Sequence, residues 1–544
     1  MNGAQLLVKC LENEGVEFIF GIPGEENLHL MDALLDSSIR FITCRHEQGA
    51  AFMADVYGRV TGKAGVCLAT LGPGATNLIT GVADANMDHA PVVAIAGQAA
   101  TTRLHKESHQ VLDLEQLFQP VSKYSSRILT PAVITEVVRK AFKVAQTEKK
   151  GACFIEFPEN IAALEIEDKP LPARLPYPPE PAPDRLAAAA ELISRAGAPI
   201  ILAGHGVVRA GAAEALTAFA ETLHIPVATT FMAKGVIPFS HPLALGSAGL
   251  QANDYVNCGF SRADLIICVG YDLVEYHPHL WHPTCDRQII HLDSTPAEVD
   301  RCYSIEVGII GDLSHALAQL AAMSAPRPGG ELMRPLRDAL LAEMEQHADD
   351  ESHPVKPQKI IHDLRRVLGP EDIVISDVGA HKMWLARMFP CEHPNTCLIS
   401  NGFASMGIAV PGAVAAALAR PERAVVAVTG DAGFLMNSQE LETALRLQCS
   451  FVVLVWSDER YGLIEWKQMN AFGRPSHVSF TNPDFRKYAE AFGARGRKVE
   501  RAADLAPLLK ESLAAPTVTV IDCPVDYREN LRLTEKLGRM VCPI

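Results

Sequence analysis

The sequence predicts an α/β protein built from three doubly wound α/β domains. Short apolar runs rich in valine and isoleucine alternate with helical segments, and two proline-rich segments interrupt this alternation. Buried parallel strands are near-continuous apolar runs, and each needs a crossover helix, so the alternation indicates parallel sheets covered on both faces. The proline-rich segments 169–183 and 324–330 suit extended linkers. We therefore expect domains over residues 1–165, 184–323 and 350–530, followed by a tail at 531–544.

The first domain shows the alternation most clearly. Strands are predicted at Phe18 to Gly21, Phe41 to Thr43, Gly65 to Leu71, Pro91 to Gly97 and Ala152 to Phe157. Helices are predicted at Ala4 to Gly15, at Gly49 to Thr61 and in a segment opened by Gly72 to Asn77. This strand-to-helix order is typical of a parallel sheet.

The other two domains repeat the pattern. Central-domain strands are predicted at Pro199 to Ala203, Ala263 to Gly270 and Gln288 to Leu292, with a helix at Ala212 to Leu223. The turn Gly204-His205-Gly206 is too short for a dinucleotide-binding fingerprint, so we interpret it as a plain strand-to-helix turn. Third-domain strands are predicted at Ile373 to Ser376, Val425 to Thr429, Phe451 to Trp456 and Thr517 to Ile521. The polar segment after Asp526 supports no assignment.

Composition indicates a cytoplasmic globular protein. The 544 residues are 48% hydrophobic and 21% charged, which is ordinary for a folded chain. The net charge of −15 argues against nucleic acid or an anionic membrane as a partner. There is no long apolar run and no basic and apolar region of a signal peptide at the N-terminus. The 13 cysteines are scattered without a CxxC pair, so we expect buried free thiols of a reducing compartment.

One βαβ unit, Val425 to Gln468, carries the strongest chemical signal. Its first strand ends in Gly430-Asp431-Ala432-Gly433, and a helix follows with Asn437 or Ser438 near its cap and Glu440 in its first turn. The second strand ends just before Asp458, 27 positions after Asp431 (458 − 431). Both carboxylates can therefore lie at adjacent strand ends, where open α/β sheets bind ligands. Two carboxylates with backbone carbonyls suit Mg²⁺, and the glycines let N–H groups approach a phosphate.

A lone GDxG turn is more often structural than functional, and the second acidic strand end is what favours a site here. The arrangement resembles the thiamine diphosphate (ThDP) binding motif. A carboxylate at a strand-to-helix junction, such as Glu47, is usually solvated or capping. However, its surroundings, RHEQGAAFMADVYGRVTGKAGVCLATLGPGATN, are similar to the pyrimidine-binding domain of ThDP enzymes in the acetohydroxyacid synthase and pyruvate oxidase group.

The resemblance runs from IFGIPGEENLHL to KYAEAFGARG and is closest to the catabolic, FAD-independent acetolactate synthases. GYDLVEYHP (270–278), DVGAHKMW (377–384), LFQPVSKY (117–124) and Asp458 carry this match. Biosynthetic relatives usually have asparagine at position 458 and a different, FAD-contacting segment at 270. The resemblance therefore implies ThDP and Mg²⁺ as cofactors and no FAD.

The resemblance also implies roles for individual residues. Glu47 would hydrogen-bond the aminopyrimidine ring nitrogen, Gln110 would face the reacting carbon, and Met406 would wedge between the cofactor's rings. Their structural alternatives are a capping carboxylate, a surface amide and a core methionine. The other cofactor contacts implied are Gly24, Pro73, Asn77, Val378, Gly379, Ala380, His381, Ala404, Gly430, Asp431, Ala432, Gly433, Tyr461, Gly462, Leu463 and Ile464. The implied metal ligands are Asp431, Asp458 and Arg460.

The implied reaction is that of an acetolactate synthase, in which pyruvate is decarboxylated and the hydroxyethyl unit joins a second pyruvate to give 2-acetolactate and CO₂. In the family, Glu47 and the diphosphate site come from different subunits, so a homodimer is the minimal active unit and a homotetramer is expected.

Three alternatives stay open: a 2-keto acid decarboxylase that releases an aldehyde, a carboligase with another acceptor, and a non-catalytic ThDP-fold protein. The lack of a His-His pair disfavours the decarboxylase, and Glu47 disfavours a glyoxylate carboligase. Glu47 and Asp431 together disfavour the non-catalytic protein. Ala432 departs from the family's GDG, and Lys467 and Trp466 depart from its Gln and Phe, which leaves the acceptor open. Lys467, as an ammonium, could bind an acceptor carboxylate; its structural alternative is a solvated lysine.

Overall fold

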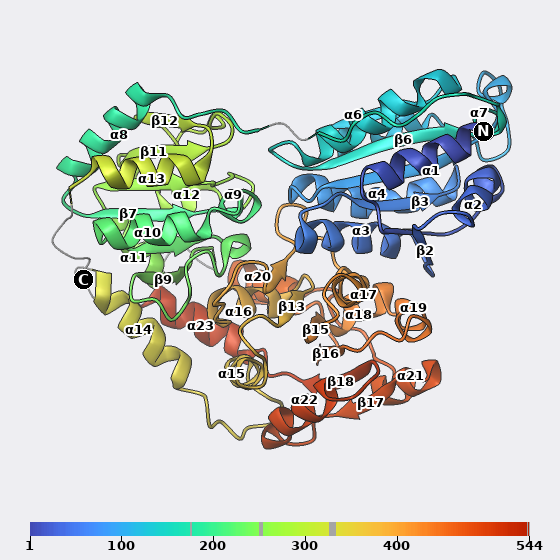
Figure 1. Cartoon of the computed structure of the whole chain (residues 1–544). Coiled ribbons are helices and arrows are strands. Elements are labelled where there is room, and N and C mark those ends of the chain that lie inside the picture. Colours follow the sequence, from blue (N-terminus) through green and yellow to red (C-terminus); the bar gives the residue numbers. More distant parts are fainter. Residues whose placement is uncertain (175–176, 250–253, 326–332, 541, 543–544) are drawn as a thin grey trace.

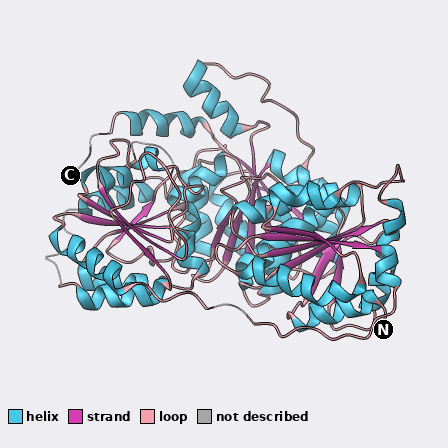
Figure 2. Cartoon of the chain, turned by 90° about the horizontal axis from the view of Figure 1, so that it is seen from above, coloured by secondary structure: helices cyan, strands magenta, loops and turns pink. Residues whose placement is uncertain are grey.

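The structure, a computed structural model, describes residues 1–174, 177–249, 254–325, 333–540 and 542. The chain forms three lobes, each built around a six-stranded sheet flanked by helices (Figures 1 and 2). The predicted fold class is therefore confirmed. Residues 175–176 of the first predicted linker, 326–330 of the second, and 541, 543 and 544 of the predicted tail lie outside the described residues.

The first sheet has the order β2-β1-β3-β4-β6-β5, with all neighbouring strands parallel. Its strands are β1 Phe18–Gly21, β2 Arg40–Thr43, β3 Gly65–Ala69, β4 Val92–Gln98, β5 Tyr124–Arg127 and β6 Ala152–Pro158. Its helices are α1 Gly3–Asn13, α2 Leu28–Leu34, α3 Glu47–Thr61, α4 Pro73–Met87, α5 Leu114–Phe118, α6 Ile134–Gln146 and α7 Glu159–Ala163. The sequence analysis missed β5 because this edge strand, YSSR, is polar and only partly buried.

The central sheet has the order β12-β11-β10-β7-β8-β9 and is also parallel. Its strands are β7 Pro199–Ala203, β8 Val227–Thr229, β9 Ala244–Ser247, β10 Leu265–Val269, β11 Gln288–Asp293 and β12 Val307–Ile310. Its helices are α8 Pro183–Arg195, α9 His205–Arg209, α10 Ala213–Leu223, α11 Tyr255–Arg262, α12 Pro278–Trp281 and α13 Leu313–Met323. Gly204 joins β7 directly to α9, as predicted for a plain turn.

The third sheet has the order β14-β13-β15-β16-β18-β17, again parallel. Its strands are β13 Ile373–Ser376, β14 Cys397–Ile399, β15 Val425–Gly430, β16 Val452–Ser457, β17 Arg495–Lys498 and β18 Thr519–Pro524. The helices of this part of the chain are α14 Arg334–Glu345, α15 Pro357–Val367, α16 Ala380–Met388, α17 Ala409–Ala419, α18 Asp431–Asn437, α19 Glu440–Arg446, α20 Gly462–Phe472, α21 Phe485–Phe492, α22 Leu505–Leu513 and α23 Arg528–Gly538. β13, β15 and β16 are adjacent, so their carboxyl ends meet at one edge of the sheet.

The first and third lobes share one hydrophobic core. Helix α3 contributes a row of buried small residues to it, and α17 packs against this row. At Gly412 of α17 a Cβ would lie 2.9 Å from a methyl group of Val56, so a larger residue would push the helices apart. The shared core holds these two lobes against each other.

Several predicted helix boundaries differ from the observed ones, and two of these differences have a clear physical cause. The helix after β15 starts at Asp431 itself, as α18, and ends at Asn437, and a second helix, α19, starts at Glu440. The Asn437 side chain bonds across the lobes to Gln48 at 3.1 Å and to the carbonyl of Gly407 at 3.0 Å, contacts that local sequence does not reveal. Helix α3 starts at Glu47 instead of Gly49, because the His46 ring accepts the N–H of Gln48 at 3.1 Å and caps it.

The segment that the sequence left unassigned forms helix α23. Leu533 and Leu537 are buried in the core of the third lobe. The expected boundary between domain and tail, at residues 530 and 531, falls inside this helix. The sequence did not predict this helix because it is mostly polar, with few apolar residues that face the core.

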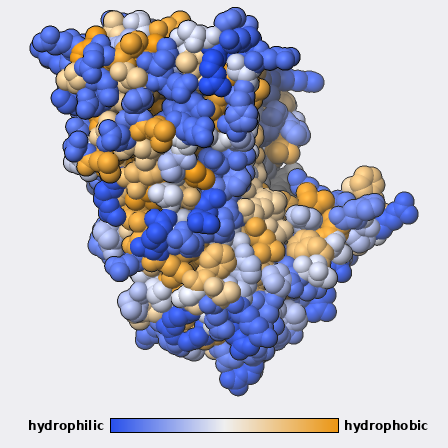
Figure 3. All heavy atoms as spheres, turned by 90° about the vertical axis from the view of Figure 1, so that its right-hand side faces the viewer, coloured by the Kyte–Doolittle hydropathy of each residue, from blue (hydrophilic) through white to orange (hydrophobic). Residues whose placement is uncertain are grey.

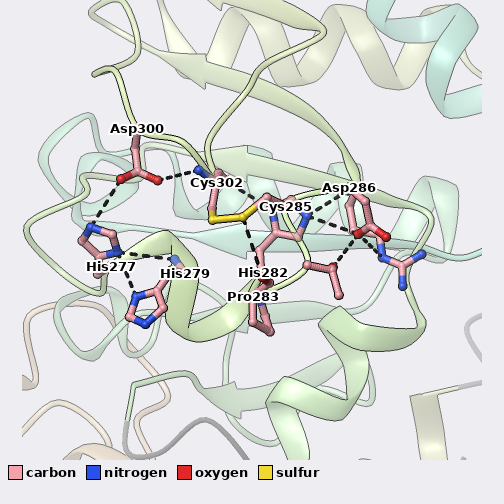
Figure 4. Close-up of a disulfide and its surroundings, with 10 residues drawn as sticks. His277, His279, His282, Pro283, Cys285, Asp286, Asp300 and Cys302 are labelled. Atoms are coloured by element: carbon pink, nitrogen blue, oxygen red, sulfur yellow. Dashed lines mark hydrogen bonds and ion pairs between the residues drawn. A yellow bond between two sulfur atoms is a disulfide. The ribbon is translucent and has the colours of Figure 1, made fainter.

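The prediction that all cysteines are free thiols is wrong for two of the 13. Cys285 and Cys302 form a disulfide in the central lobe, surrounded by His277, His282 and Asp300 (Figure 4). The fold brings their Cα atoms to 4.3 Å although they are separated by 17 positions, a spacing without a recognisable motif. The other eleven are free, and all of these except Cys542 are buried, as predicted.

Among the described residues, none of the helices combines the length and apolarity needed to cross a membrane. The face of the molecule drawn in Figure 3 carries apolar patches among polar areas. Large apolar side chains at the surface include Phe403 (43% exposed), Leu435 (38%), Met436 (43%), Tyr461 (40%) and Ile464 (48%).

Candidate functional site

A cavity of about 250 Å³ lies at the carboxyl ends of β13, β15 and β16. Every cofactor and metal residue that the sequence placed in the third domain lines it: Val378, Gly379, Ala380, His381, Ala404, Met406, Gly430, Asp431, Ala432, Gly433, Asp458, Arg460, Tyr461, Gly462, Leu463 and Ile464. Trp456 and Tyr527 line it as well. Loops at adjacent strand ends of an open parallel sheet thus converge on one cavity.

Asp431 organises the floor of this cavity. Its buried carboxylate accepts the backbone N–H groups of Asp458 at 3.0 Å and Glu459 at 2.7 Å, and the side-chain amide of Asn482 at 2.8 Å. Its other oxygen accepts the N–H of Ala432 at 2.9 Å. These bonds tie the end of β15 to the loop after β16, so the acidic residues of both strand ends lie together.

The carboxyl group of Asp458 lies beside that of Asp431, and the opposing charge of Arg460 does not offset its surroundings. Burial, and then the charges of Asp431 and Glu465, raise the pKa of Asp458 to about 8. The Oδ1 atom of Asn482 is buried without a hydrogen-bond partner in the described structure. A divalent cation here would relieve both conditions, since it stabilises the ionised carboxylate and accepts oxygen ligands.

The donor set fits Mg²⁺ better than a transition metal. The described part of the chain has no group of three or more His, Cys, Asp and Glu side chains arranged for a metal ion. Mg²⁺ uses one or two protein carboxylates and completes its shell with carbonyls, water and phosphate. The guanidinium of Arg460 pairs with Glu465, so Arg460 can offer a metal only its backbone carbonyl.

Two helices begin at the cavity with free N–H groups. Gly379 is the N-cap of α16 and Tyr461 is the N-cap of α20, and neither end has a side-chain cap among the described residues. A Cβ at Gly379 would lie 2.7 Å from the His381 ring, so glycine permits the close packing at this turn. Uncapped helix N-termini beside these two carboxyl groups suit an anion such as a diphosphate, if a cation is bound between them.

Two polar ring atoms at the cavity lack partners. His381 Nε2 and Trp456 Nε1 are buried and make no hydrogen bond among the described residues. Burial lowers the pKa of His381 to about 3, so its imidazole is neutral at physiological pH. Buried polar groups are normally hydrogen-bonded, which indicates that a ligand is needed to satisfy this lining.

Ala404 and Met406 reach the cavity on a segment without regular secondary structure, residues 400–407. Ala404 has a φ of 56°, a left-handed conformation that is uncommon for alanine. Asp377 holds the end of this segment by accepting the N–H groups of Gly407 at 2.9 Å and Ala409 at 3.2 Å. The surrounding structure therefore determines where Met406 lies.

The predicted first-domain residues gather at a separate place. Glu47, 9% exposed at the start of α3, accepts a hydrogen bond from the Asn77 side chain at 3.0 Å. A Cβ at Gly74 would lie 3.3 Å from the Glu47 carboxylate, so the start of α4 approaches it closely. Glu47 and Asn77 thus form one polar pair at the carboxyl ends of the strands of the first sheet.

Gly24, Pro73 and Gln110 surround this pair. Gly24 packs against Thr70, and Gly72, just before Pro73, has a φ of 52° and lies against the backbone of Gln110. Pro73 and Gln110 are exposed. Within the described chain, neither these residues nor Glu47 and Asn77 line the third-lobe cavity. One chain therefore holds two separate halves of the predicted site.

Lys467 lies on the exposed side of α20 and, among the described cavities, lines none. Its charge does act on Lys382, a buried lysine that donates to the carbonyl of Ser400 at 2.8 Å. Trp466, its neighbour, is 6% exposed and donates to Thr534 at 2.8 Å. The two unusual residues of this segment therefore differ in burial, with Trp466 packed inside and Lys467 at the surface.

Sequence reasoning missed Trp456, Tyr527 and Asn482. Trp456 is inside a predicted strand and looked like an ordinary core residue. Tyr527 precedes α23, which brings it beside the cavity from the unassigned segment. Asn482 reaches Asp431 from 51 positions away. The only sequence signal for further polar groups at this site was the acidic residue Asp458, which follows β16.

Comparison with known protein families matches the three lobes one by one. Residues 1–117 match the model of the thiamine pyrophosphate enzyme N-terminal TPP binding domain, residues 186–320 that of the central domain, and residues 377–523 that of the C-terminal TPP binding domain. Thiamine pyrophosphate is the same cofactor as ThDP. The two matched TPP binding domains are the lobes that carry the two halves of the site.

Full-length relatives agree with this. The chain is 37% identical to an acetolactate synthase of Bacillus subtilis over 99% of its own length and 95% of the relative. It is 37% identical to a catabolic acetolactate synthase of Raoultella terrigena, covering 98% and 97%. It is 36% identical to a probable acetolactate synthase large subunit of Methanocaldococcus jannaschii, covering 99% and 94%.

Proposed function

We propose that this chain, which belongs to the ThDP-dependent enzymes of the acetolactate synthase family, decarboxylates pyruvate and joins the two-carbon unit to a second pyruvate. The products are 2-acetolactate and CO₂. The observation that carries this proposal is the pairing of Asp431 and Asp458 at adjacent strand ends, beside uncapped helix N-termini and within a family of acetolactate synthases.

The third lobe would hold the diphosphate end of the cofactor. Asp431, Asp458 and the carbonyl of Arg460 would bind Mg²⁺, and the N–H groups at the starts of α16 and α20 would bind phosphate oxygens. His381 Nε2 and Trp456 Nε1, which lack partners among the described residues, are further candidates for contacts. Bound ThDP supplies the electron sink that makes loss of CO₂ from a 2-keto acid feasible.

The first lobe would hold the pyrimidine end. Glu47 would share a proton, through its carboxyl group, with the aminopyrimidine ring nitrogen, and Asn77 fixes the orientation of that carboxyl group. Gln110 is exposed beside Gly72 and would face the substrate. Met406 would separate the two halves of the cofactor, and Lys467 would interact with the acceptor carboxylate.

A second copy of the chain would complete the site. Glu47 and its neighbours lie outside the cavity of their own chain among the described residues. Phe403, Leu435, Met436, Tyr461 and Ile464 are partly exposed large apolar side chains on or next to elements that line the cavity. A second chain would bury these side chains and bring its own Glu47 to the cavity, which supports a homodimer. Two such dimers would form the expected homotetramer.

The central lobe supports a flavin-free enzyme. The Glu275 carboxyl group accepts the N–H of His205 at 3.0 Å and a hydrogen bond from Thr230, and thus occupies the turn between β7 and α9. A nucleotide phosphate would normally approach the N–H groups of such a turn. Here a side chain of the GYDLVEYHP segment already accepts the N–H of His205, and the N–H of Gly206 donates to the carbonyl of Gly270.

Product analysis tests this function. The purified protein is incubated with pyruvate, ThDP and Mg²⁺, and the products are identified by NMR. We expect 2-acetolactate in amounts that depend on both cofactors, and the Glu47→Gln variant serves as the control for non-enzymatic products. Acetaldehyde as the only product would replace the proposal by a decarboxylase, and no product would point to another donor or to a non-catalytic protein.

A further inference from the structure

The position of Met406 depends on the contacts that hold the irregular segment around it. The segment 400–407 carries Ala404 and Met406 into the cavity without helix or strand structure of its own. Asp377 holds only its last residue. Something else must hold the first part, Ser400 to Ser405, because an irregular segment is ordered only by the contacts it makes.

Lys382 donates to the carbonyl of Ser400, the Asn401 side chain donates to the carbonyl of Glu275, and two carboxyl groups at the end of α4 make the remaining contacts. Asp88 accepts the N–H of Asn401 at 2.9 Å and the N–H of Gly402 at 2.5 Å. Asp84, one turn earlier, accepts the hydroxyl of Ser400 at 2.7 Å and the N–H of Ser405 at 3.3 Å. The Ser400 hydroxyl also accepts the N–H of Ser405 at 3.2 Å. The turn from Ser400 to Ser405 is thus closed around these two acids.

A single arginine holds both acids in place. Arg59 of α3 donates to Asp88 at 2.8 Å, to Asp84 at 3.4 Å, and to Asp55 at 2.6 Å. A fourth partner of Arg59 is the carbonyl of Ile399, just before the segment, at 3.0 Å. The three aspartates are at most 1% exposed and Arg59 is 8% exposed, so the network excludes water.

The same two helices carry residues of the proposed site at their opposite ends. Glu47 is the first residue of α3 and Asn77 lies in the first turns of α4, whereas Arg59, Asp84 and Asp88 lie at the far ends. The first lobe therefore offers Glu47 to the cofactor at one end and, at the other, holds the segment that presents Met406 in the third lobe.

We propose that Asp84 and Asp88 are positioning residues, which set the conformation of the segment 400–406 and thereby place Met406 against the bound cofactor. This inference rests on the proposed function, because Met406 has a role only if the cavity binds ThDP. It assigns to the buried acids a task beyond the stability of the fold, and it makes the placement of Met406 dependent on the first lobe.

The acceptor atoms of Asp84, not its charge, are predicted to matter. Burial and the charges of Asp88 and Asp55 raise the pKa of Asp84 well above its usual range, which disfavours the charged form of this carboxyl group. Asparagine keeps one acceptor oxygen for Ser400 and Ser405 and a donor in place of the proton. We therefore expect Asp84→Asn to be tolerated and Asp84→Ala to be defective.

The experiment compares Asp84→Ala, Asp84→Asn and Ser400→Ala. Calorimetry measures ThDP affinity in the presence of Mg²⁺, and steady-state kinetics measure kcat and the KM for pyruvate per folded protein. Ser400→Ala removes the hydroxyl that joins Asp84 to Ser405. It is a smaller change than Asp84→Ala, so we expect this variant to fold even if Asp84→Ala does not. Ser512→Ala is its control, since Ser512 has the same 2% exposure on α22.

We expect Asp84→Ala and Ser400→Ala to weaken ThDP binding and lower kcat by roughly tenfold or more, because each leaves a buried polar group without its partner. Asp84→Asn and Ser512→Ala should stay near wild type, and the KM for pyruvate should change little. In a Met406→Ala background the Ser400→Ala effect should shrink, since the two changes act through one contact.

Wild-type ThDP affinity and kcat in Ser400→Ala would overturn the inference, and so would full additivity with Met406→Ala. Equal losses of ThDP affinity and kcat in Asp84→Asn and Ser400→Ala, in parallel with a lower melting temperature of both variants, would also overturn it. A wild-type protein that binds ThDP but makes no acetolactate would contradict the proposed function alone, because the binding measurements still decide the role of Asp84.

Discussion

The carboxylate of Asp431 accepts the backbone N–H of Asp458 at 3.0 Å, which joins the ends of two adjacent strands through one hydrogen bond. The Asp458 carboxyl group lies beside Asp431, partly buried and with a raised pKa. This one relationship combines a structural task, holding the loop, with a chemical one, creating a place for a cation.

Asp431→Ala should weaken Mg²⁺-dependent ThDP binding by more than about a hundredfold, beyond the loss typical of an outer partner of a metal site. It removes a proposed metal ligand and also releases the N–H groups of Asp458 and Glu459. Asp458→Asn should stay within roughly tenfold of wild type, because an amide oxygen still coordinates Mg²⁺. Calorimetric titration ranks the two variants, and circular dichroism checks that both are folded. The reverse ranking would show that the metal site is assigned wrongly.

Glu47→Gln should lower turnover by roughly a hundredfold or more while ThDP still binds, since the amide cannot share a proton. If the site lies between two chains, mixing and refolding Glu47→Gln with Asp431→Ala should restore activity. The mixed dimer then has one site in which both residues are native. Each variant refolded alone is the control. Mixtures no more active than the controls would place the complete site within one chain.

Lys467→Gln should raise the KM for pyruvate as acceptor and lower the ratio of acetolactate to acetaldehyde. A charged hydrogen bond to the acceptor carboxylate is worth roughly tenfold to a hundredfold. The exposed position of Lys467 leaves it free to face a second chain. Product ratios for both proteins give the measurement, and Lys487→Gln, an exposed lysine on α21, is the control. Identical ratios and kinetics would place Lys467 outside the site.

Thermal stability should decrease as the pH rises from about 5 to 9, in part through Glu275. Burial, and then the charge of Asp272, raise the pKa of Glu275 to about 8 from a usual 4.5. The folded state therefore holds a proton that the unfolded state has lost, so the stabilising contribution is complete below the unfolded pKa and disappears as the pH passes 8. Glu275→Gln should flatten the curve of melting temperature against pH. A parallel curve would exclude Glu275 as the group responsible.

The sequence was sufficient for the architecture because burial and hydrophobic pattern agree. Strands β7 and β13 have the bounds predicted, since each is buried along its whole length and consists almost entirely of apolar residues. The polar edge strand β5 and the helix α23 escaped prediction for the opposite reason. Each contributes only a few apolar residues to a core that distant segments complete.

The third-lobe half of the site was largely predictable, because its residues follow strand ends and belong to recognisable motifs. What the sequence could not show are contacts over long separations. Asp84 and Ser400 are 316 positions apart, and the side chain of Asn482 reaches Asp431 from another loop. The disulfide of Cys285 and Cys302 belongs to the same class, since only the folded central lobe brings the two thiols together.

The number of pyruvate molecules consumed for each CO₂ released tests the central claim most directly. Ligation uses one pyruvate as donor and one as acceptor and releases CO₂ only from the donor. With saturating ThDP and Mg²⁺, we predict that two pyruvate molecules disappear for every CO₂ formed. A ratio of one, with aldehyde accumulating in step with CO₂, would contradict the account and identify the protein as a simple decarboxylase.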